Sequence, residues 1–192
     1  MLPTASHRPI LHRLVPVPHR GLRTAVQVVL GVAFLALLAQ VRIVVGPVPI
    51  TGQTLGVLLL AAAAGGRLGA ATTLAYLGVG AAGLPVFTGG GAGLSALTGA
   101  TAGYLVGFVV AAAVVGALAE RGGVAGPARA AATMVVGNVV IYAFGVTWLA
   151  QLAPDLRTAF AWGVAPFLVG DALKIAVATA LLPLAARAWR PR

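Results

Sequence analysis

The stretch GVAPFLVGDALKIAVATALLP (residues 163–183) is apolar except for one acid and one base, Asp171 and Lys174. A run of about 20 apolar residues is long enough to cross the hydrocarbon core of a bilayer as a helix. Charges at that depth are costly, and they normally face the bundle interior and mark a pathway or a binding site. The stretch therefore predicts a transmembrane helix with two functional charges, three residues apart on one helix face.

The rest of the chain has the same apolar character. Hydrophobic residues make up 60% of the 192 positions and charged residues only 8%, and the mean hydropathy is +1.01. A soluble domain needs a more polar surface than this composition supplies. We therefore expect an all-α, multi-pass protein of the cell membrane. Cysteine is absent, which excludes disulfides and thiolate metal sites.

Charge-free runs divide the chain into six predicted transmembrane helices. They form a single domain over residues 23–192, preceded by a basic, Pro-rich cytoplasmic tail at residues 1–22. The tail lacks the apolar region and cleavage site of a secretory signal. The six runs cover residues 24–41, 54–66, 68–84, 99–119, 130–150 and 162–186.

The positions of the basic residues predict the orientation and explain the formal net charge of +10. Cytoplasmic loops of membrane proteins are enriched in Lys and Arg. With both termini cytoplasmic, only Arg42 and Arg157 fall outside. A basic RNA-binding surface is the alternative, but no aromatic platform accompanies these arginines. The arginines on the cytoplasmic side are Arg8, Arg13, Arg20, Arg23, Arg67, Arg121, Arg129, Arg187, Arg190 and Arg192.

Glycines at four-residue spacing recur in the predicted helices. Gly99, Gly103 and Gly107 form one such series, and Gly65 and Gly69 form another. This spacing lets helix backbones approach closely in a membrane. We favour packing inside the bundle, and a docking face for another membrane protein is the alternative.

Further polar side chains could join the two charges. Asn138 and Tyr142 are four residues apart on one helix face, although a helix–helix hydrogen bond and a packed aromatic would explain them equally well. Residues 46–56 carry two prolines and then Thr51, Gln53 and Thr54, and a stiff external turn is the alternative there. The uncharged, Gly-rich segment 83–104 lacks the G-K-[ST] ending of a phosphate-binding loop. We expect it to form a flexible lid over an external pocket.

No catalytic constellation is present, so the sequence predicts a protein that is not an enzyme and has no cofactor. The histidines (His7, His12 and His19) all lie in the tail, and three acids are too few for a nucleotide-hydrolysing metal centre. There is no Walker motif. Energy for accumulating a solute would have to come from a partner or from an ion gradient.

Four ordered blocks resemble the BioY family, the biotin-binding S components of energy-coupling factor transporters. They are GPVPITGQTLGVLLLAAAAGGRLGAATTLAYLGVGAAGLPVF (46–87), LTGATAGYLVGF (97–108), NVVIYAFGVTWLA (138–150) and GVAPFLVGDALK (163–174). The resemblance implies six helices that capture biotin from outside. It also implies two kinds of partner, a transmembrane coupling protein and a pair of cytoplasmic ATPases that use ATP. Ala100 stands where the family more usually has Pro, and the first helix lacks the family's strict A-x-x-x-A pattern.

The resemblance also implies a set of binding residues. The ureido group of biotin has two N–H donors and a carbonyl acceptor, which suit a carboxylate such as Asp171 and donors such as Asn138 or Lys174. Its apolar ring and chain suit aromatic walls such as Tyr104, Tyr142 and Trp148, and its carboxylate suits Thr and Gln donors or loop amides. The motifs place Thr51, Gln53 and Thr101 in the same site. Which end of biotin faces the two charges stays open.

Two other classes of function stay open at the level of sequence. One is a secondary transporter or channel for another small solute, with Asp171 as a proton or ion relay. The other is a membrane assembly subunit in which Asp171 and Lys174 form only a structural ion pair.

Overall fold

The computed structural model describes residues 19–188, without the side chains of residue 181 and residues 183–188. The predicted tail lies largely outside these residues, together with Arg8, Arg13, Arg190, Arg192, His7 and His12. The all-α prediction is confirmed. The helices are α2 (Arg20–Gln40), α3 (Gln53–Ala64), α4 (Gly66–Ala81), α5 (Ala102–Leu118), α6 (Pro127–Leu149), α7 (Leu156–Gly163) and α8 (Leu168–Ala188).

Short elements connect the helices. Strands β1 (Arg42–Ile43) and β2 (Ile50–Thr51) pair antiparallel as a small ribbon between α2 and α3. Two 3₁₀ turns, η1 (Thr88–Gly90) and η2 (Leu94–Leu97), lie between α4 and α5, and a π-helical turn, η3 (Ala119–Gly123), extends α5.

Fewer helices than six are long enough to cross a bilayer by themselves. Within the described residues, α2, the helix formed by α5 and η3, and α6 have sufficient length and hydropathy. Helices α3 and α4 have 12 and 16 residues, short of the roughly 20 that the hydrocarbon core requires. They are nevertheless packed within the bundle, since nine of the twelve residues of α3 are buried.

The sixth predicted run is not one continuous helix, and that prediction is wrong in this respect. Helices α7 and α8 meet at a bend of 44°. Pro166 lies in the four-residue break between them, and proline both lacks an N–H donor and disfavours helical geometry in the residue before it. Trp162 therefore belongs to α7, and Asp171 lies in the first turn of α8.

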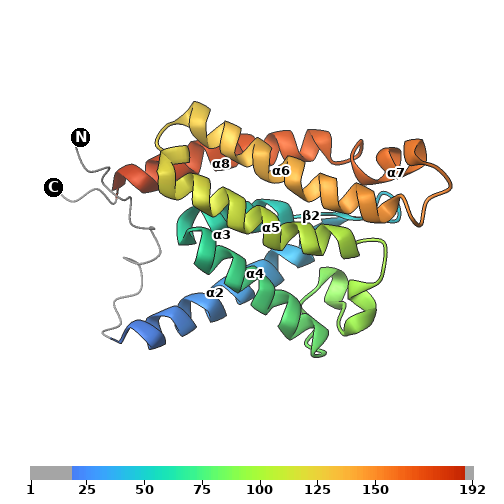
Figure 1. Cartoon of the computed structure of the whole chain (residues 1–192), viewed down its shortest axis with the longest axis horizontal. Helices are drawn as coiled ribbons and strands as arrows, with labels where there is room; N and C mark the ends of the chain where they lie inside the picture. Colours follow the sequence, from blue (N-terminus) through green and yellow to red (C-terminus); the bar gives the residue numbers. More distant parts are fainter. Residues whose placement is uncertain (1–18, 189–192) are drawn as a thin grey trace.

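The connections gather at two opposite ends of the bundle, as Figure 1 shows. The start of α2, the α3–α4 junction, η3 and the end of α8 lie at one end. The β1–β2 ribbon, η1, η2 and α7 lie at the other. The elements that carry Arg42 and Arg157 are at the second end, whereas Arg20, Arg67 and Arg121 belong to the first. This separation agrees with the predicted two-sided charge distribution.

Glycines let the helices pack closely around α5. A Cβ added to Gly116 would lie 2.5 Å from the Gly66 Cα, and one added to Gly107 would lie 3.2 Å from the Ile141 Cα. Gly103 likewise faces α6, and Gly69 faces Ala61 of α3. Packing inside the bundle is therefore confirmed for these glycines. The outward faces carry exposed apolar side chains, such as Leu37 and Val169.

Candidate functional site

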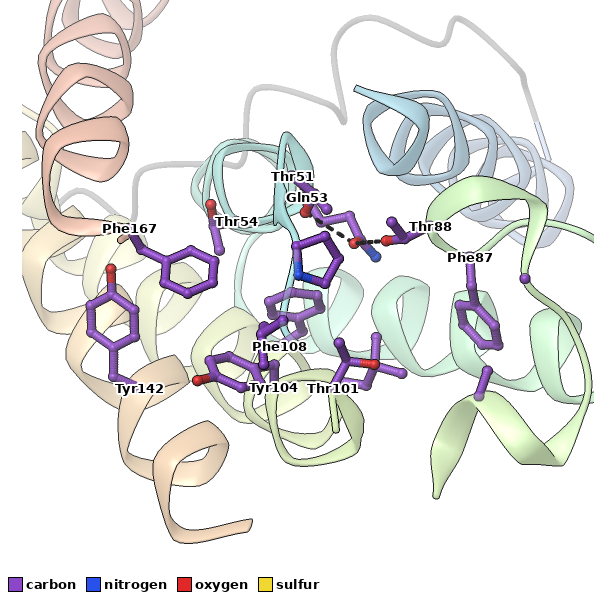
Figure 2. Close-up of a pocket in the computed structure, with 15 residues that line it drawn as sticks. Thr51, Gln53, Thr54, Phe87, Thr88, Thr101, Tyr104, Phe108, Tyr142 and Phe167 are labelled. Carbon is purple, nitrogen blue, oxygen red and sulfur yellow. Dashed lines mark hydrogen bonds between the residues drawn. The ribbon is translucent and has the colours of Figure 1, made fainter. Parts of the chain in front are cut away.

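A cavity opens at the end of the bundle that carries the β1–β2 ribbon and η1. The space between its walls, together with the open mouth, amounts to about 700 Å³. Figure 2 shows its labelled side chains converging from β2, α3, α5, α6 and the segment around η1. The lining consists of Val48, Pro49, Thr51, Gln53, Thr54, Phe87, Thr88, Gly91, Ala96, Thr101, Tyr104, Leu105, Phe108, Tyr142 and Phe167.

Aromatic side chains form much of the wall. Tyr104 and Phe108 are four residues apart, so they occupy one face of α5. The Phe167 ring lies 6.3 Å from the Tyr104 ring and 6.5 Å from the Tyr142 ring, centroid to centroid. The Tyr104 hydroxyl donates to the Gly163 carbonyl at 2.7 Å, which anchors α5 to the end of α7. The site therefore presents rigid apolar rings to a ligand.

A hydrogen-bond network fixes the Gln53 amide at the start of α3. Its Oε1 accepts from the Thr51 hydroxyl at 3.0 Å and from the Thr88 hydroxyl at 2.8 Å, as the dashed lines in Figure 2 show. Its Nε2 donates to the Tyr76 hydroxyl at 2.9 Å, which in turn donates to the Val86 carbonyl. One Nε2 hydrogen then has no partner among the described residues and is free to donate to a ligand.

The buried Asp171 and the partly buried Lys174 form an ion pair, with 2.8 Å between Nζ and Oδ1. The Lys174 ammonium also donates to the Thr54 hydroxyl at 2.8 Å, and Thr54 donates to Asp171 Oδ1 at 3.4 Å. The Tyr142 hydroxyl donates to Asp171 Oδ2. The pair thus connects α8 with α3 and α6.

Two side chains that bond to the ion pair, Thr54 and Tyr142, separate it from the large cavity. Neither Asp171 nor Lys174 lines that cavity, whereas Thr54 and Tyr142 do. The phenolic hydrogen of Tyr142 is committed to the carboxylate, so only the lone pairs of its oxygen are available to a ligand. In this geometry the charges act on the cavity through these two side chains.

The nine predicted binding residues do not all lie in one cavity. Five of them line the large cavity: Thr51, Gln53, Thr101, Tyr104 and Tyr142. Lys174 and Asn138 instead border a narrow crevice beyond Thr54, where the buried Asn138 Oδ1 has no partner among the described residues. Asp171 lines neither of these spaces, but it accepts hydrogen bonds from Tyr142 and Thr54, which line the large cavity.

Trp148 lines neither the large cavity nor the crevice beyond Thr54. Its indole Nε1 donates to the Gly99 carbonyl at 3.0 Å, which ties α6 to the segment before α5. The structure thus gives it a packing partner rather than a position in the wall. A binding role for any of the nine residues stays a prediction.

Several lining residues were not predicted from the sequence, namely Phe87, Thr88, Phe108 and Phe167. A signal existed for Phe108, because it lies one helical turn after Tyr104. Phe167 follows the Pro166 break, which would have indicated a separate final helix. Phe87 and Thr88 lie in the segment predicted as a lid, where no periodicity indicates which side chains turn inward.

The predicted lid, residues 83–104, covers one side of the cavity and is held in place by hydrogen bonds to α2 and α4. Gln40 Nε2 donates to the Phe87 carbonyl at 3.1 Å, and the Gly93 N–H donates to the Gly80 carbonyl at 2.8 Å. Gly89 has a positive φ of 69°, a conformation that glycine adopts without steric cost. A flexible lid stays a prediction.

Comparison with known proteins points to one family. The profile of the BioY family matches residues 9–191. The biotin transporter BioY of Rhizobium etli is 41% identical over 154 residues, which are 77% of this chain and 82% of that protein. The biotin transporter BioY of Thermotoga maritima is 40% identical over 140 residues, 73% of this chain and 82% of that one.

The fold has a counterpart among solved structures. The crystal structure of the S-component for biotin from an ECF-type ABC transporter superposes with a TM-score of 0.79. The match covers 92% of this chain and 95% of that chain at 22% sequence identity. At this identity the likeness establishes the shared fold.

Proposed function

Because the chain belongs to the BioY family, we propose that it is the biotin-binding S component of an energy-coupling factor transporter and mediates biotin uptake. The family consists of transporter subunits, so the chain is not an enzyme. The observation that carries the proposal is the cavity itself, in which aromatic walls surround a few polar groups oriented by neighbouring side chains.

The chemistry of the cavity suits biotin. Tyr104, Phe108 and Phe167 offer apolar surface to the thioether ring and the valeryl chain. The Tyr142 oxygen, whose hydrogen is given to Asp171, accepts a ureido N–H. The free Nε2 hydrogen of Gln53 is a further donor for an oxygen of the ligand. No cofactor takes part in binding.

The proposed membrane arrangement has six spans and both termini in the cytoplasm, with residues 23–192 as one domain in the cell membrane. The cluster of basic residues at one end of the bundle supports this orientation. Helices α3 and α4 are short spans: neighbouring helices cover most of α3, whereas α4 keeps an exposed face that carries Leu74. The cavity then opens to the outside.

Energy for uptake comes from partners in this proposal. A pair of cytoplasmic ATPases hydrolyses ATP, and a transmembrane coupling protein connects these ATPases to this chain during the transport step. A secondary transporter with Asp171 as an ion relay fits the geometry less well, because Lys174 neutralises the carboxylate and Tyr142 separates it from the cavity.

The decisive experiment measures binding of radiolabelled biotin to the purified protein without nucleotide. We expect saturable binding and no biotin-stimulated ATPase activity by the protein alone. Tyr104→Ala opens the aromatic wall and should weaken binding, whereas Val139→Ala, an exposed position on α6, is the matched control. Absence of saturable binding, or uptake by this protein alone driven by a proton gradient, would refute the proposal.

A further inference from the structure

The proposed ligand carries a charge for which the cavity wall has no counterpart. Biotin is an anion at neutral pH because its valerate carboxyl is ionised. The residues that line the large cavity are apolar, hydroxylic or amide-bearing, and none is charged at that pH. The nearby Lys174 ammonium is already paired with Asp171. A carboxylate therefore needs a cation from the rim of the cavity.

Arg42 occupies such a rim position. In the antiparallel ribbon it pairs directly with Thr51, so the two side chains lie on the same face, and Thr51 lines the cavity. The guanidinium rests against Gly89, because a Cβ built on that glycine would lie 2.6 Å from Arg42 Cζ. Gly89 directly follows Thr88, another lining residue.

The guanidinium of Arg42 is available for a ligand. Within residues 19–188 no hydrogen bond or ion pair engages it, and the residue is exposed. Its planar fork of N–H donors matches the two oxygens of a carboxylate. The other arginine at this end, Arg157, is on α7 and has no such position beside the ribbon and η1.

We propose that Arg42 binds the valerate carboxylate at the mouth of the cavity. This inference rests on the proposed function and specifies the orientation of biotin in the cavity. The valeryl chain runs toward the ribbon and η1, and the ureido ring lies at the other side, near Tyr142 and Phe167, which Figure 2 shows opposite Phe87 and Thr88.

The test compares biotin with biotinamide, which is the same molecule with a neutral amide in place of the carboxylate. Arg42→Gln should weaken binding of biotin about tenfold, the loss expected for a hydrogen bond to a charged group near water. It should change binding of biotinamide less than twofold. Arg42→Lys should restore part of the affinity for biotin, and added salt should weaken biotin binding to the unmodified protein.

Arg157→Gln is the matched control, since it removes the same charge from the same end and should leave both affinities unchanged. The inference is overturned if Arg42→Gln leaves biotin binding unchanged, or if it weakens both ligands equally, as a merely structural role would. It also fails if Arg157→Gln has the same effect as Arg42→Gln. If the unmodified protein binds neither ligand, the proposed function itself fails, which is a distinguishable result.

Discussion

Asp171 is the residue on which the packing of three helices converges. Its carboxylate accepts from Lys174, Thr54 and Tyr142 and is only 3% exposed. A buried carboxylate is tolerated because these donors replace water. The same bonds hold Thr54 and Tyr142 in the cavity wall, so Asp171 supports both the packing of the helices and the shape of the cavity.

Substitutions at the ion pair separate these two roles. Asp171→Asn strands the Lys174 charge, and breaking a buried pair costs up to about 3–5 kcal/mol, so both the melting temperature and biotin affinity should fall. The double variant Asp171→Leu, Lys174→Met removes both charges and should recover stability. It should not recover affinity, because Tyr142 loses its acceptor. Melting in detergent and biotin binding measure the two effects.

The contradicting result is a double variant that binds biotin with normal affinity. The pair would then be structural alone, and the binding determinants would lie in the network around Gln53. A single variant with unchanged melting temperature and unchanged affinity would show that the carboxylate has neither role.

At the scale of the elements, the contact of η3 and α5 with the α3–α4 junction depends on glycine. Helices α3 and α4 meet at Gly65, whose φ of 86° allows the chain to reverse without a loop. Gly116 of α5 packs against this junction. The Glu120 carboxylate then accepts from the Gly66 N–H at 3.1 Å, which satisfies one of the free donors at the start of α4.

Gly116→Ala tests this contact. The added Cβ would lie 2.5 Å from the Gly66 Cα, a backbone atom that cannot rotate away, so overpacking of about 1–3 kcal/mol is expected. Gly78→Ala is the control, because no atom lies within 4 Å of its Cβ position and alanine favours the helix. A lower melting temperature for Gly116→Ala and an unchanged or higher one for Gly78→Ala would agree with this packing; equal values would contradict it.

At the scale of the whole molecule, the two ends differ in charge, and this difference predicts the orientation. The chain has no cysteine, so single cysteines can be introduced without background labelling. Gly46 lies between β1 and β2, Gly126 lies between η3 and α6, and neither has an atom within 4 Å of its Cβ position. Both positions therefore accept the new side chain.

In intact cells an impermeant thiol reagent should label Gly46→Cys and not Gly126→Cys. Permeabilised cells should show labelling of both, which controls for accessibility of the thiol. The reverse pattern would refute cytoplasmic termini, and labelling of both in intact cells would refute the arrangement of spans.

The class of the molecule and the approximate positions of its helices could be predicted from the order of the amino acids. A long apolar run forms a helix in lipid because a helix satisfies its backbone groups within the run itself. The proximity of Asp171 and Lys174 could also be predicted, since a spacing of three residues places both side chains on one helix face. The ordered motifs span most of the chain, and for this reason they indicated both the family and the fold.

Which side chains surround the cavity and which lie behind it depends on contacts between segments that are far apart in the chain. Thr54 is 117 residues from Asp171 and Tyr142 is 29 residues away, and no local spacing relates their positions. Trp148 was expected in the wall, yet its indole is bonded to Gly99. Contacts of this kind depend on how closely the glycine-bearing faces of α5 and α6 approach and on the bend between α7 and α8, and both are properties of packed helices rather than of any one segment.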